Sequence, residues 1–194
     1  MAGRRAAAGL GLAALALTTA GCGLGSTKTV TVKSRTITTT VTVTTTAAAT
    51  VAKPCTGEQL SGTFALVPGS AGAGQIEYAL TLTNTSQSAC YVRGIPRATL
   101  LDASAGALPT HVTAAGRETP ARVVLEPGAA SVAHARFSPD VPGQGDSQSG
   151  ACQPQAHTLQ VTPNGGGVTD AAIKPSTSVC EQGALHFEAL GYAG

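Results

Sequence analysis

The segment IEYALTLT, residues 76–83, alternates strictly between apolar and small or polar side chains. A period of two is typical of a β-strand with one buried face, because successive side chains of a strand point to opposite sides. This segment therefore predicts a half-buried strand with a sheet around it. The face expected in the core carries Ile76, Tyr78, Leu80 and Leu82, and the other face carries Glu77, Ala79, Thr81 and Thr83.

Residues 55–194, which surround this strand, consist of short apolar runs separated by glycine- and proline-rich turns, without a sustained helical period. Many short strands at such intervals are typical of a β-sandwich, and alternation with one wet face favours antiparallel pairing. We predict that this region is an all-β domain, an immunoglobulin-like antiparallel β-sandwich, which we call the head. Further strands are expected at residues 62–67, 91–93, 98–102, 108–113, 121–125, 131–137, 157–162, 168–173 and 185–190.

The expected topology of the first hairpin pairs two of the head cysteines. If residues 62–67 and 76–83 form a hairpin, Cys55 and Cys90 flank the two strand ends that lie side by side. We therefore predict the disulfide Cys55–Cys90 among the three connectivities that four cysteines allow.

A second hairpin, of residues 157–162 and 168–173, brings Cys152 near Cys180 by the same argument. Two disulfides indicate an oxidising compartment. The alternative, a zinc site, requires close pairs of the Cys-x-x-Cys kind, and the gaps between these cysteines are far wider. We expect the disulfide Cys152–Cys180 and no metal.

Residues 1–21 have a basic start, an apolar run and small residues before a cleavage point, as a secretory signal peptide has. The apolar run, about a dozen residues, is shorter than the ~20 needed to span a membrane. Ala20-Gly21 before Cys22 resembles the bacterial lipobox, in which the cysteine receives a lipid and becomes the first mature residue. The acyl chains, such as palmitate, would hold the protein at the membrane.

Two observations bear on lipidation at Cys22. It is the odd cysteine of the chain's five and lies outside the head, which favours a lipid on its thiol. Thr19, however, stands where the lipobox usually has leucine or another aliphatic residue. Ordinary secretion, with Cys22 an unused thiol, is the alternative.

Residues 22–54 are dominated by threonine with interspersed valine and have no aromatic residue. Low-complexity sequence of this kind does not build a core. The Thr/Val alternation has the period of a strand, but no partner in register is evident. We therefore interpret residues 22–54 as a disordered, lipid-anchored linker, the stalk.

Charge divides unevenly along the chain. The stalk has four basic residues and no acid, whereas the chain from residue 54 onward has six basic residues and all ten acidic ones. Nucleic-acid binding would favour a basic head with a clustered patch. A mildly acidic head therefore argues against a nucleic-acid partner.

Several short motifs occur in a fixed order along the head. Taken with the cysteine framework, they resemble an actinobacterial domain-of-unknown-function family, numbered forty-two thirty-two, from Cys55 to about Leu190. The resemblance implies a β-sandwich and secretion or lipid anchoring, and it implies no known activity. Arg97 departs from it, since glycine is expected there. The motifs are Cys55 with Leu60, Gly72-Ala73-Gly74, Leu82-Thr83-Asn84-Thr85, Cys90, Gly94-Ile95-Pro96, Leu125-Glu126-Pro127-Gly128, Cys152 and Cys180.

No set of residues suggests a catalytic or metal site. His134 shares the polar face of its strand with Arg136, and His186 shares one with Glu188, so all four are expected at the surface. Neither His-Glu-x-x-His nor Gly-x-Ser-x-Gly occurs. The chain is therefore expected to be no enzyme, with no cofactor and no metal.

Two segments of the head have competing interpretations. Residues 138–156 form a long Gly-, Pro- and Gln-rich loop, either a binding loop or, as we favour, a disordered one. Its Asp140 and Asp146 fall short of the calcium-loop pattern. Asn84-Thr85-Ser86 fits an N-glycosylation sequon, but we favour a turn in which Asn84 adopts unusual backbone angles.

The sequence thus favours a cell-envelope lipoprotein on the extracytoplasmic face of the membrane, attached through lipid on Cys22. Its head is expected to be a monomeric, non-catalytic binding domain for an unknown envelope protein or glycan. A passive structural or antigen-like protein is the second hypothesis, and an extracytoplasmic enzyme is the third.

Overall fold

The computed structural model describes residues 27–33, 38–44, 51–116 and 121–193. The chain divides into two compact units, residues 1–50 and 51–194. The predicted signal peptide and Cys22 lie outside the described residues. Within the described part of the chain, no helix is long and apolar enough to cross a membrane.

The stalk contains two strands, β1 (Thr27–Lys33) and β2 (Thr38–Thr44), which pair antiparallel. Val30 is opposite Val41, and Thr27 is opposite Thr44. The prediction of a disordered stalk without a partner strand is therefore wrong for these two segments. β-branched residues favour strands, and the partner of the first Thr/Val run is the second one.

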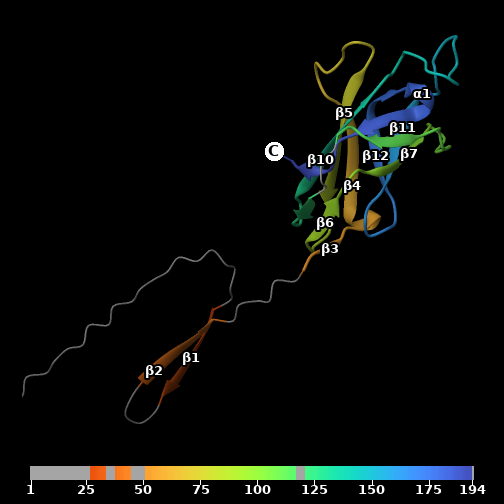
Figure 1. Cartoon of the computed structure of the whole chain (residues 1–194). Coiled ribbons are helices and arrows are strands. Elements are labelled where there is room, and N and C mark those ends of the chain that lie inside the picture. Colours follow the sequence, from red (N-terminus) through yellow and green to blue (C-terminus); the bar gives the residue numbers. More distant parts are fainter. Residues whose placement is uncertain (1–26, 34–37, 45–50, 117–120, 194) are drawn as a thin grey trace, which may run out of the picture. The chain divides into compact units, whose positions relative to one another are not determined.

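Most of the head's strands form one large sheet with the order β7-β11-β12-β4-β5-β10-β13-β8, to which β14 adds by pairing with β10 (Figure 1). These strands are β4 (Leu60–Leu66), β5 (Ile76–Asn84), β7 (Arg97–Leu101), β8 (His111–Ala114), β10 (Ala130–Phe137), β11 (Ala156–Thr162), β12 (Thr169–Thr177), β13 (Ala184–Phe187) and β14 (Gly191–Tyr192).

A second sheet has the order β3-β6-β9, formed by β3 (Lys53–Pro54), β6 (Cys90–Arg93) and β9 (Arg122–Leu125). Two short turns complete the head. They are η1 (Gly57–Gln59) and α1 (Cys180–Gly183), a single turn in which Glu181 and Gln182 have positive φ angles of 55° and 59°.

The core fills the space between the two sheets. The alternation of β5 places Tyr78, Leu80 and Leu82 inside, as predicted, and the ring centroid of Tyr78 lies 5.1 Å from that of Phe64 on β4. The small sheet adds buried residues from β6 and β9, including Val92. Both sheets therefore bury their inner faces in one hydrophobic core, which is the arrangement of a sandwich.

The all-β fold is confirmed, and each predicted strand of the head overlaps an observed one. The prediction of purely antiparallel pairing is wrong for three pairs, β12 with β4, β13 with β8, and β3 with β6, which are parallel. Alternation along a strand specifies which face is buried but does not specify the direction of the neighbouring strand. The immunoglobulin-like topology within this fold class stays a prediction.

The disulfides close the open ends of two hairpins. β4 pairs antiparallel with β5, so that Leu60 is opposite Asn84, and Cys55 and Cys90 beyond these ends are bonded to each other. β11 and β12 pair likewise, with Cys152 bonded to Cys180 beyond their open end. These are the pairings predicted from the hairpins.

Asn84 ends β5 and is fully buried, with an ordinary negative φ. Its side-chain amide donates to the carbonyls of Ser88 and Leu125, both at 2.9 Å, and its Oδ1 accepts from the backbone N–H of Ser86 at 3.0 Å. The interpretation of a turn is thus correct, but the expected unusual backbone angles are absent. The role of Asn84 is to connect the end of β5 to β9 through its side-chain amide.

Replacing Asn84 with Asp tests this connection. A carboxylate cannot donate to the two carbonyls and would be buried as a charge, so we expect the free energy of unfolding to fall by about 3 kcal/mol. The measurement is a urea unfolding curve.

Asn164→Asp is the matched control, because Asn164 is exposed and its Oδ1 only accepts, from the backbone N–H of Arg93. Equal stability of the Asn84→Asp protein and this control would contradict the assigned role of Asn84.

Candidate functional site

Two of the four histidines, His134 and His186, lie in one groove of about 410 Å³ on the outer face of the large sheet. We call it the histidine groove. His111 and His157 are exposed at the starts of β8 and β11 and do not line it. The groove is lined by Gln75, Glu77, Ala114, Ala115, His134, Arg136, His186 and Glu188.

The strand register brings these side chains together. Arg136 on β10 is opposite both Glu77 on β5 and His186 on β13, since β10 lies between these two strands. The backbone N–H of Glu188 donates to the carbonyl of His134 at 2.8 Å. The sequence correctly predicted that His134 and His186 lie opposite buried neighbours, but it treated them as separate surface residues, because register cannot be read from one strand.

Contacts within the groove orient both histidine rings. Nδ1 of His134 lies 2.7 Å from Oε1 of Glu77, and Nη2 of Arg136 lies 3.6 Å from the other oxygen of that carboxylate. Nδ1 of His186 lies 2.8 Å from Oγ1 of Thr113. A carboxylate that orients a histidine is a feature of general-base sites, but the residues that line this groove include no serine or cysteine to act as a nucleophile.

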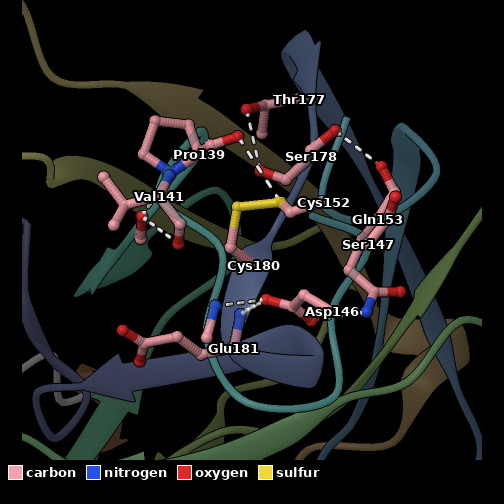
Figure 2. Close-up of a disulfide and its surroundings, with 12 residues drawn as sticks. Pro139, Val141, Asp146, Ser147, Cys152, Gln153, Thr177, Ser178, Cys180 and Glu181 are labelled. Atoms are coloured by element: carbon pink, nitrogen blue, oxygen red, sulfur yellow. Dashed lines mark hydrogen bonds between the residues drawn. A yellow bond between two sulfur atoms is a disulfide. The ribbon is translucent and has the colours of Figure 1, made fainter. Parts of the chain in front are cut away.

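The loop of residues 138–156 is held in place by the buried carboxylate of Asp146 (Figure 2). Asp146 accepts hydrogen bonds from the Gln153 side chain at 2.7 Å, from the Gly143 N–H at 2.8 Å, and from the N–H groups of Glu181 and Gln182 in α1. The interpretation of this loop as disordered is therefore wrong. The length of the loop and its Gly-, Pro- and Gln-rich composition suggested disorder, whereas one acidic residue and the disulfide connect the loop to α1.

The same contacts account for a close group of potential metal ligands, Asp146, Cys152 and Cys180, whose ligand atoms lie within 4.8 Å of one another. Both sulfur atoms are joined in the disulfide. The carboxylate oxygens face N–H donors, which are unsuitable neighbours for a cation. This group therefore has the chemistry of a structural clamp.

A second groove, of about 500 Å³, lies between the β6–β7 turn and the β11–β12 hairpin, and we call it the arginine groove. Arg93 and Arg97, both exposed, are the charged residues of the lining, and within the described part of the chain this lining has no carboxylate, histidine, serine or cysteine. The lining residues are Leu82, Arg93, Gly94, Ile95, Pro96, Arg97, Val161, Thr162, Pro163, Asn164 and Leu190.

Backbone contacts shape the arginine groove. Gly94 has a φ of 81°, a left-handed conformation that favours glycine, and its carbonyl accepts from the N–H of Leu190 at 2.9 Å. Across the groove, Oδ1 of Asn164 accepts from the backbone N–H of Arg93 at 2.9 Å. This groove was not predicted from the sequence. Its only signals were the Gly94-Ile95-Pro96 motif and the unexpected Arg97.

The Asp146 clamp predicts a specific acid sensitivity. The hydrogen bond from Gln153, followed by those from the backbone N–H groups, lowers the pKa of Asp146 from 3.8 to about 2. A lowered pKa stabilises the fold above the ordinary value of an aspartate, about pH 4. This stabilisation is lost as the pH falls through about 2.

We therefore expect Asp146→Asn to be less stable than the wild type at neutral pH, and the difference to shrink as the pH falls from about 4 towards 2. Urea unfolding at several pH values measures it. Asp140→Asn, an exposed change in the same loop, is the control and should follow the wild type. A difference for Asp146→Asn that does not depend on pH would contradict the role of its carboxylate.

Comparison with known proteins places this head in a family. A search of the curated proteins and a search of the solved structures each found no match. The model of the family described as domain of unknown function (DUF4232) matches residues 55–190, from the first disulfide cysteine to the leucine on the floor of the arginine groove. Because this match covers more than half of the 194 residues, the chain belongs to the DUF4232 family.

Proposed function

We propose that the protein is a cell-envelope lipoprotein whose head is a non-catalytic binding domain. Lipid on Cys22 would anchor it to the extracytoplasmic face of the membrane, and residues 22–54 would separate the head from that surface. The two disulfides support this location, because they indicate an oxidising environment outside the cytoplasm.

The composition of the arginine groove carries the binding part of the proposal. A groove of about 500 Å³ is within the range of small-molecule sites, which are mostly apolar with a few polar groups. Its lining supplies cations, an amide, the hydroxyl of Thr162 and apolar side chains, but the described residues that form it include no carboxylate, histidine, serine or cysteine. Such a lining is suited to holding a ligand rather than to converting it.

A second candidate function, hydrolysis at the histidine groove, is favoured by the contact between Glu77 and His134. This contact leaves Nε2 of His134 as the nitrogen that would activate a water molecule. A chromogenic ester series tests it by comparing the wild type with His134→Asn. Equal rates for the two proteins would favour the binding domain, and a loss of rate in the variant would favour the enzyme.

The anchor is tested by the intact mass of the protein isolated from host membranes, compared with that of a Cys22→Ala variant. We expect the added mass of acyl chains on the wild type and its absence from the variant, which should be released from the membrane because each buried methylene contributes about 0.8 kcal/mol.

The same samples test whether the four head cysteines are oxidised. Alkylation before reduction should modify no head cysteine, and after reduction it should modify four: Cys55, Cys90, Cys152 and Cys180. A freely secreted wild-type protein without lipid would contradict the anchored part of the proposal.

A further inference from the structure

We propose that the arginine groove binds a small amphiphilic anion, a single carboxylate or phosphate group attached to a short apolar chain. This inference rests on the proposed function as a binding domain and names its site and the chemical class of its ligand. Its support is the position of the arginines, the hydrogen-bonding state of Asn164 and the apolar floor.

The charge of the groove is opposite to that of the head as a whole. The chain from residue 54 onward has six basic and ten acidic residues, a net charge of −4 (6 − 10). Two of those six, Arg93 and Arg97, are at the groove, and none of the described residues that line it is an acid. A hollow that concentrates one sign of charge between low-dielectric walls attracts ligands of the opposite sign.

A third arginine is paired with Arg93 in the small sheet. Arg93 on β6 is directly opposite Arg122 on β9, and both are exposed. Like charges in directly opposite positions destabilise a pair of strands. The side chain of Arg122 is placed over the Tyr91 ring, 4.6 Å from its centroid, and the ion pairs found among the described residues both involve Glu77. A bound anion would relieve the repulsion between Arg93 and Arg122.

The polar rim of the groove offers donors. Arg93 and Arg97 carry guanidinium groups, which match the geometry of carboxylates and phosphates. Asn164 already uses its Oδ1 to accept from the N–H of Arg93, so its amide N–H₂ is the part available to a ligand. An anion accepts from all three side chains, whereas a cation would face three sets of donors.

The floor of the groove is apolar. Leu82, Val161 and Leu190 are buried beneath it, and half-buried Ile95, in the turn between the two arginines, packs against the core and is partly accessible. Inorganic phosphate has no apolar part, so it would leave the accessible apolar surface of the groove in contact with water. Burial of accessible apolar area stabilises a complex, so the half-buried side chain of Ile95 above this floor favours an anion that carries an apolar chain.

Calorimetric titration of the secreted chain carrying Cys22→Ala tests the proposal with four probes. These are octanoate, octyl phosphate, octyltrimethylammonium and inorganic phosphate. We expect the two amphiphilic anions to bind at one site. We expect no binding of octyltrimethylammonium, which has the same chain and the opposite charge, and much weaker binding of inorganic phosphate, which lacks the chain.

Variants locate the site. Arg93→Gln and Arg97→Gln should each weaken binding of octyl phosphate about tenfold, because each removes a charge-assisted hydrogen bond. The double variant should abolish it. Arg136→Gln is the matched control, an exposed arginine of the histidine groove, and should bind as the wild type does. All three positions are exposed, so no variant should lose the fold, and a cooperative thermal unfolding transition would confirm this.

Three outcomes would overturn the proposal. They are no binding of either amphiphilic anion, equal binding of octyltrimethylammonium, and equal weakening by Arg136→Gln. Inorganic phosphate binding as tightly as octyl phosphate would overturn the role of the apolar floor.

These failures are distinct from failure of the proposed function. If the titrations are negative but the mass measurement shows acylation of Cys22, the protein is an anchored domain with another ligand. If the titrations are positive but the mass measurement shows no acylation of Cys22, the groove binds the anion in a secreted protein.

Discussion

The packing of four aromatic rings against the inner face of β5 is the interaction on which the head depends. The chain has only three phenylalanines and three tyrosines, and Phe64, Phe137, Phe187 and Tyr78 all lie in one buried cluster. Their ring centroids are 5.1 to 6.3 Å apart in the contacting pairs. Because β4, β5, β10 and β13 each contribute one ring, the cluster aligns these strands. The same alternation that directs the rings inward directs Glu77, His134 and His186 outward, so the histidine groove follows from the core.

The two disulfides reinforce a core that is poor in large side chains. In the chain-entropy account, cross-links closing loops of this length each contribute about 3.5 kcal/mol. Their positions also matter for the surface. Cys90 is the first residue of β6, whose end leads into the turn of the arginine groove, and Cys152 and Cys180 hold the 138–156 loop against α1. The loops that form the surface features are therefore supported close to where they leave the core.

The two grooves differ in chemistry although each contains arginine. In the histidine groove, Arg136 lies beside Glu77, so its charge is compensated within the sheet. In the arginine groove, Arg93 and Arg97 lie among apolar and amide groups, and Arg93 is opposite another arginine. Compensated charges stabilise a surface, whereas like charges gathered around a hollow favour an external partner of opposite sign. This contrast is the physical reason for assigning ligand binding to the arginine groove.

The sequence by itself determined most strands of the head, their buried faces and the disulfide partners. These depend on alternation and on the order of neighbouring hairpins, which are local properties of residues such as those at 76–83 and of Cys55 and Cys90. It did not determine the parallel partner of β12, the hairpin of the stalk, or the Asp146 clamp, because each joins segments whose pairing leaves no local pattern. Only the tertiary structure placed Arg93 opposite Arg122 and beside Arg97 and Asn164, since strand register and the packing of two distant turns decide which surface side chains meet.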